Sequence, residues 1–172
     1  MVTVAAAAVA GFLASVPALG ADEGCAKVQK ALENVVTTPA HAYATETSSM
    51  RGTTETETIY LDGKVYVLAN GRWTLSPVSS VEMARQLRRN RNNTGMTCSL
   101  VGEEKVGDRP TRVYTTSRRT GDSEIQGKLW IDQASGLLLK QEEDLAGEKD
   151  NTVRRSTRYE YGNVSAPKID SP

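Results

Sequence analysis

Two segments of the chain space their apolar residues like helices, and most of the remainder alternates like strands. Residues 24–36 repeat apolar side chains at intervals of three and four, which predicts an amphipathic helix. A second helix is predicted over 79–91, because Ser79 and Glu82 there have the form of a capping box.

The alternating stretches predict two groups of β-strands. The first group covers 40–50, 53–61, 64–69 and 72–75, and the second covers 96–101, 111–117, 124–132, 137–145 and 152–161. Asp62-Gly63 and Asn70-Gly71 are two-residue hairpin signals, so neighbouring strands run antiparallel. Antiparallel runs with separate helices predict an α+β domain, in which a curved sheet carries an N-terminal and a mid-chain helix on one face.

The first 21 residues set the expected compartment. Residues 2–21 contain no charge and end in Pro17-Ala-Leu-Gly-Ala21, which predicts a secretory signal segment cleaved near Gly20 or Ala21. A transmembrane anchor is the alternative, and no Lys or Arg precedes the apolar run. Cys25 lacks the Leu-small-small triplet that lipid attachment needs, so we expect a periplasmic protein that is not lipidated.

The rest of the chain is expected to form one domain over 22–165, followed by a flexible tail over 166–172. Lys and Arg total 21 and Asp and Glu total 21, so no basic excess recommends nucleic acid as a partner. Cys25 and Cys98 are the only cysteines. In an oxidising compartment we expect them to form a structural disulfide rather than to act as catalytic thiols.

The sequence offers little for catalysis. The single histidine, His41, has no Cys or second His at metal-ligand spacing, so we interpret it as a solvated or hydrogen-bonded strand residue. Glu55 and Glu57 share a strand face, a pattern typical of an exposed edge. Because no nucleophile–base pair or metal cluster is visible, we expect a non-catalytic protein without cofactor or metal.

Arginines crowd the second predicted helix, at Arg85, Arg88 and Arg89. They could form an anion site for lipid headgroups or an acidic partner, with at most peripheral membrane contact. We favour the alternative, a solvated face whose stems pack along the sheet edge.

Two segments carry a family resemblance. Residues 101–114 read VGEEKVGDRPTRVY, a hairpin whose second arm follows a Gly-x-x-Pro turn, and residues 129–140 read LWIDQASGLLLK, a strand, a turn and a strand. With the order of helices and strands, they resemble the bacterial periplasmic lipoprotein-carrier (LolA-like) superfamily, which includes outer-membrane lipoprotein-sorting proteins. The resemblance implies an unclosed half β-barrel that binds a lipid, a lipoprotein acyl chain or another hydrophobic molecule in its concavity.

Large side chains are expected either to fill the core or to line that concavity. The predicted ligand-binding residues are Tyr43, Tyr60, Tyr66, Trp73, Trp130, Leu137 and Leu139. The only Phe, Phe12, lies in the leader, and several predicted strands have thin apolar faces. These features favour the alternative function, an envelope interaction or structural protein whose half-barrel is filled by its own side chains and which acts through protein contacts.

Overall fold

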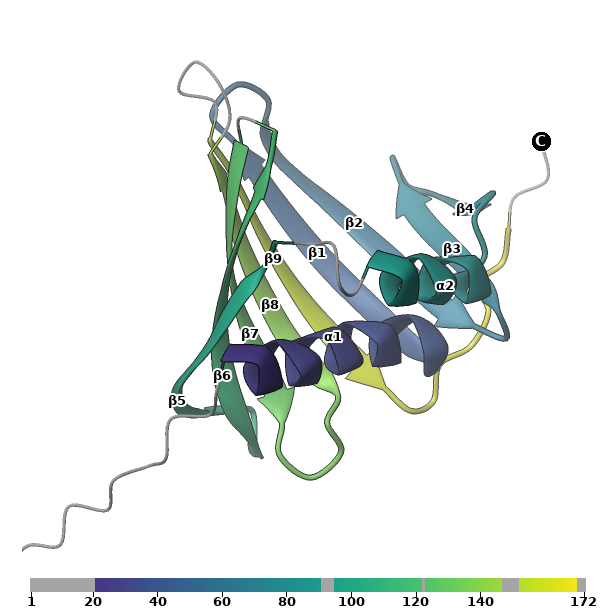
Figure 1. The fold of residues 1–172 in the computed structure, drawn as a ribbon. Helices are drawn as coiled ribbons and strands as arrows, with labels where there is room; N and C mark the ends of the chain where they lie inside the picture. Colours follow the sequence, from purple (N-terminus) through teal and green to yellow (C-terminus); the bar gives the residue numbers. More distant parts are fainter. Residues whose placement is uncertain (1–20, 91–94, 122, 147–151, 170–172) are drawn as a thin grey trace, which may run out of the picture.

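The computed structural model describes residues 21–90, 95–121, 123–146 and 152–169. Two helices and nine strands follow one another within these ranges in the predicted order (Figure 1). They are α1 (Ala21–Thr37), β1 (Ala40–Ser48), β2 (Gly52–Leu61), β3 (Lys64–Ala69), β4 (Arg72–Leu75), α2 (Ser80–Asn90), β5 (Thr97–Val106), β6 (Arg109–Thr120), β7 (Ser123–Asp132), β8 (Leu138–Ala146) and β9 (Thr152–Tyr161).

The strands form one antiparallel sheet in the order β4-β3-β2-β1-β9-β8-β7-β6-β5. The last strand pairs with the first, since Ala40 lies opposite Tyr161, and it also pairs with β8, since Lys140 lies opposite Arg158. β4 and β5 remain as edges, so the sheet does not close into a barrel. Both helices lie across one face (Figure 1), which confirms the predicted α+β curved sheet.

The two predicted hairpin turns are present. Asp62 and Gly63 have φ of 51° and 78°, and Asn70 and Gly71 have φ of 53° and 73°. Two consecutive positive φ values match the twist of the flanking strands, and Asp-Gly and Asn-Gly accept them at low cost. These turns set the β2–β3 and β3–β4 registers.

The core lies between the helices and the sheet. Val28 and Ala31 of α1 are at most 1% exposed and pack with Tyr114, Leu129 and Leu138 of the sheet. We call the sheet face that carries these three side chains the inner face, and the opposite one the outer face. Because the α1 stripe meets the apolar end of the sheet, burial at about 25 cal/mol per Å² holds the helix in place.

A disulfide joins Cys25 of α1 to Cys98 of β5, as predicted. The helix lies close to the strand at this point: a Cβ atom built on Gly24 would be 3.4 Å from the carbonyl oxygen of Cys98. The N-terminal half of α1 is therefore fixed against an edge of the sheet.

Several predicted strand ends need correction, most of all those around the β5–β6 turn. β5 runs to Val106 and β6 starts at Arg109, whereas the sequence predicted an end at 101 and a start at 111. A bulge between Leu100 and Gly102 interrupts the alternation on which the prediction depended. Residues 1–20 of the predicted signal segment and 170–172 of the predicted tail lie outside the described residues. Within the described residues, neither helix is both long and apolar enough to cross a bilayer.

Candidate functional site

The inner face beneath the helices is largely filled by the chain itself. Tyr114, Leu129 and Leu138 are at most 2% exposed there. A cavity of about 200 Å³ remains, lined by Leu32 and Leu87 from the helices and by polar side chains such as Glu143 from the sheet. Ligand pockets usually measure roughly 300–1,000 Å³, so this space suits at most a very small guest.

A larger opening runs beside α1. It measures about 500 Å³, and its wall is mostly apolar. We call it the α1 groove. It is lined by Glu23, Ala26, Lys27, Lys30 and Asn34 of α1, by Arg112, Tyr114, Ile131 and Asp132 of the sheet, and by Gln133, Ser135 and Gly136 of the turn after β7.

Helical spacing explains the helix wall of the groove. Ala26, Lys30 and Asn34 are four residues apart and therefore stack along one side of α1, beside the apolar stripe that enters the core. From Glu23 to Asn34 this wall is about 16 Å long at 1.5 Å per residue. The small side chain of Ala26 leaves room between the helix and the sheet.

Two neighbouring strands supply the floor. Tyr114 of β6 and Ile131 of β7 are 1% and 7% exposed, and both join the core cluster on their helix side. Arg112 lies opposite Ile131 in the β6–β7 register and is about half-exposed. The groove thus has an apolar floor with a cation at its strand-side rim.

The turn after β7 bounds the groove at one end. Asp132 is 3% exposed, and its carboxylate accepts hydrogen bonds from the Ser135 backbone N–H at 2.8 Å and the Arg109 Nε at 3.1 Å. Burial opposes ionisation of Asp132, but these donors outweigh it and hold its pKa below the usual range. Asn34 Nδ2 donates to the Gly136 carbonyl at 3.4 Å, so the turn is tied to α1.

The charges along the groove are mainly positive. Lys27 pairs with Glu23 at 3.1 Å, and Arg112 lies 3.9 Å from Glu103. Lys30 is exposed and forms no ion pair with any described residue. Since Arg109 already neutralises Asp132, three cations and one exposed carboxylate line the groove.

The structure places five of the seven predicted ligand-binding residues on the outer face and the other two, Tyr60 and Leu137, elsewhere. Tyr60 packs against the inner-face core, and Leu137 lies in the turn before β8. The cross-strand partners Trp130, Lys140, Arg158, Tyr43, Glu57, Leu68 and Trp73 form one continuous row on the outer face. Tyr66 and Leu139 lie on that face too, next to this row. Ligand contact by these residues remains a prediction.

His41 is a hydrogen-bonded strand residue on the outer face, one of the two environments predicted for it. Its Nε2 lies 2.8 Å from the Glu57 carboxylate, and its Nδ1 lies 3.0 Å from the Tyr43 hydroxyl. Burial, followed by the charges of Glu160 and Glu57, raises the pKa of Tyr43, so this phenol stays a neutral donor. A groove of about 800 Å³ separates this cluster from residues 162–167, and its arginines are paired with carboxylates.

The arginines of α2 are also engaged. Arg85 and Arg89 both pair with Glu82, at 3.2 Å and 2.9 Å. Arg88 pairs with Glu33 and so links α2 to α1. Their role as an anion site remains a prediction, because carboxylates of the chain already occupy them.

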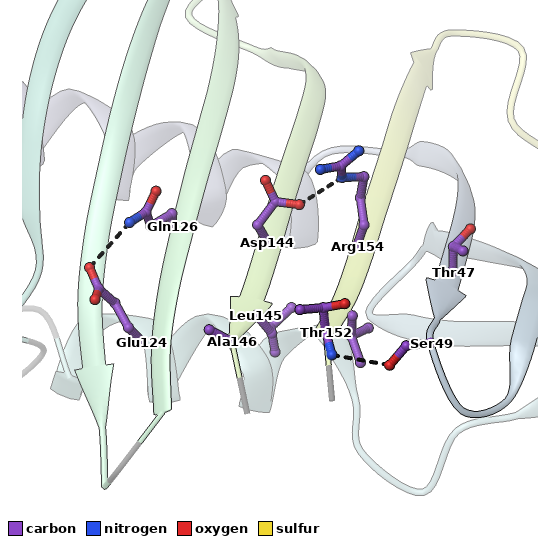
Figure 2. Close-up of a pocket in the computed structure, with 10 residues that line it drawn as sticks. Thr47, Ser49, Glu124, Gln126, Asp144, Leu145, Ala146, Thr152 and Arg154 are labelled. Atoms are coloured by element: carbon purple, nitrogen blue, oxygen red, sulfur yellow. Dashed lines mark hydrogen bonds and ion pairs between the residues drawn. The ribbon is translucent and has the colours of Figure 1, made fainter. Parts of the chain in front are cut away.

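A further opening of about 670 Å³ lies near the other end of the strands (Figure 2). Its polar side chains bond one another: Arg154 pairs with Asp144 at 2.8 Å, and Gln126 donates to Glu124 at 3.3 Å. Across the described residues, no group of three or more His, Cys, Asp or Glu side chains is placed to hold a metal ion. The α1 groove is therefore the candidate site with an apolar floor and an unpaired charge.

Comparison with solved structures finds similar folds at low sequence identity. LprF from Mycobacterium bovis matches over 86% of this chain and 96% of its own, with 9% identity and a TM-score of 0.42. MucB, solved in complex with MucA(peri), matches over 83% of this chain and 57% of its own, with 20% identity and a TM-score of 0.47. A LolA superfamily protein from Nitrosomonas europaea matches over 83% of this chain and 94% of its own, with 8% identity and a TM-score of 0.31.

No protein-family profile matches the chain, and no curated protein matches it. The structural neighbours include a protein named for the superfamily that the sequence motifs resemble. At these identities the likeness is one of fold, and it carries no ligand or partner over to this chain.

Proposed function

We propose that this chain is an exported, non-catalytic envelope protein that binds the hydrophobic chain of a lipid, a lipoprotein or a similar amphiphile in the α1 groove. The uncharged segment at residues 2–21 supports export by the criteria for secretory signals. The apolar floor made by Tyr114 and Ile131 supports the binding role.

The single observation that carries this function is the α1 groove itself. At about 500 Å³ it lies within the range of ligand pockets, which combine an apolar wall with a few polar groups. Ala26 lines its helix side, and the turn after β7 bounds it at one end. A flexible apolar chain can lie along α1 in this space without displacing the core.

A blocking substitution tests the proposal. Ala26→Trp places a ring in the groove, whereas Ala69→Trp adds the same ring at an exposed position at the end of β3. Wild type and Ala69→Trp should bind a fluorescent acyl probe with the same affinity. Ala26→Trp should bind it at least about tenfold more weakly, because the new ring prevents part of the acyl chain from being buried. The proposal would be contradicted if the protein does not bind the probe and if mass spectrometry of its solvent extract detects no lipophile.

The filled inner face favours a second function, that of an interaction or structural protein acting through its surface. Its specific support is the small cavity beneath the helices, about 200 Å³. In-cell cross-linking should then trap one protein partner reproducibly, and Ala26→Trp should leave that adduct unchanged. Loss of the adduct in Ala26→Trp would mean that the α1 groove itself is needed for the function.

A further inference from the structure

We infer that the α1 groove selects amphiphiles whose polar end is anionic, with Lys30 as its main contact and Lys27 and Arg112 beside it. This inference rests on the proposed function, since it concerns the head of a molecule whose chain lies in the same groove. The shared chemistry is a carboxylate or phosphate attached to an apolar chain.

The cations come from both walls of the groove. Lys27 and Lys30 are three residues apart on α1 and are neighbours on its surface, while Arg112 belongs to β6 across the floor. A head group that enters between the walls meets positive charge from the helix and from the sheet. Such an arrangement attracts an anion and repels a cation.

The carboxylates near the groove partly offset Lys27 and Arg112, but none of the described ones pairs with Lys30. Asp132 is 3% exposed and already bonded to Arg109 and Ser135, so it presents no free charge to a ligand. Glu23 pairs with Lys27 at 3.1 Å, and Glu103 lies at 3.9 Å from Arg112. Lys30 is left with its full charge on an exposed ammonium.

The apolar floor decides between an amphiphile and a free anion. An inorganic anion would gain the exposed cations alone, which are screened by salt. A chain in the groove adds burial of its own apolar surface against the mostly apolar wall, which salt does not weaken. Cations beside a mostly apolar wall therefore favour a molecule with both an anionic head and an apolar chain.

The test compares amphiphiles with one dodecyl chain and different heads, below their micelle concentrations, by calorimetry. Dodecanoate should bind most tightly, dodecyl maltoside less tightly and dodecyltrimethylammonium least. The difference should shrink as salt is added. A short-chain phosphatidylglycerol in the same assay distinguishes a phospholipid head from a free carboxylate, and inorganic phosphate should not compete with either.

Lys30→Glu provides the residue-level test. It should weaken dodecanoate binding at least about fivefold, the effect of one exposed cation near an anionic head, while dodecyl maltoside binding stays unchanged. Lys64→Glu makes the same change at the exposed start of β3 and serves as the matched control.

The outcomes separate the two claims. If none of the three amphiphiles binds the wild type, the proposed function itself is wrong. If all three bind with equal affinity and Lys30→Glu does not change that affinity, the groove binds the apolar chain without discriminating between head groups. This inference is then overturned. If Ala26→Trp leaves dodecanoate binding intact, the anion site lies elsewhere and the inference is equally overturned.

Discussion

The indole N–H of Trp130 donates to the carboxylate of Glu104, 2.7 Å away, on the outer face of the sheet. Lys128 and Lys140 lie over the Trp130 ring, with Nζ at 4.6 Å and 4.4 Å from its centroid. The ring is buried although neither of the two described helices covers it, since lysine stems and the Glu104 carboxylate enclose it. Trp130 is thus a structural residue of the outer face.

This contact predicts a pH dependence. The Trp130 hydrogen bond, followed by the Lys128 hydrogen bond, lowers the pKa of Glu104. A carboxylate with a depressed folded-state pKa stabilises the fold above its unfolded pKa, and this contribution is lost as the pH falls through the folded pKa. Glu104→Gln should therefore destabilise the protein at neutral pH, and the difference from wild type should shrink in acid.

Urea unfolding at a series of pH values measures this difference. Glu103→Gln, the exposed neighbour in β5, is the control for removing a surface carboxylate from the same strand. A Glu104→Gln difference that does not change with pH would show that the Trp130 contact does not depend on the charge.

The disulfide predicts a large stability loss on removal. Cys25 and Cys98 are separated by 73 positions, and in the chain-entropy model a cross-link over such a loop stabilises the fold by about 4 kcal/mol. The double variant Cys25→Ser/Cys98→Ser should lose about that amount in chemical denaturation, and reductant should affect only the wild type. Two reactive thiols in the unfolded, unreduced protein would contradict the pairing.

Gly127 predicts a coupled pair of substitutions. A Cβ at this position would lie 2.5 Å from the Thr116 hydroxyl on β6, and the β-branched side chain of Thr116 has few rotamers in which to move away. Gly127→Ala should cost about 1–3 kcal/mol, the usual range for overpacking. Adding Thr116→Ala should recover most of that loss, whereas equal costs in both backgrounds would mean that the clash is relieved elsewhere.

We expect Asp132 to stabilise the turn that bounds the α1 groove. Its carboxylate is buried, and Asp132→Ala leaves the donors of Arg109 and Ser135 without their acceptor, so we expect a loss of about 1–3 kcal/mol. The pKa of Asp132 is depressed, so wild type should lose this advantage as the pH falls through its folded pKa. Asp144→Ala, which removes an exposed ion pair with Arg154, should cost at most about 1 kcal/mol.

Local chemistry made the elements predictable. Asp62-Gly63 and Asn70-Gly71 specify their turns through backbone conformation alone, and the apolar spacing of 24–36 specifies a helix without reference to the rest of the chain. The β7–β8 hairpin was also predictable, because Leu129 and Ile131 alternate with Trp130 and the two sets do lie on opposite faces.

The site was much less predictable, for a physical reason. Alternation indicates which residues share a face, but it does not say which face the helices cover. The sequence therefore groups Trp130 and Tyr43 with Tyr60, although they lie on the opposite face of the sheet. The α1 groove depends on Ala26 and Lys30 lying beside strands that follow about a hundred positions later. Its one sequence signal is the small residue Ala26 beside the apolar stripe of the helix. That signal does not indicate a groove until the positions of the neighbouring strands are known.

The place of β9 has a consequence for how the protein is made. This strand comes last in the chain but lies fifth among nine in the sheet, with four strands on either side. A nascent polypeptide that lacks residues 152–161 can form only two unjoined four-stranded sheets, whose open edges at β1 and β8 would be exposed to pairing with other chains. The two halves of the sheet therefore join only once β9 has been made.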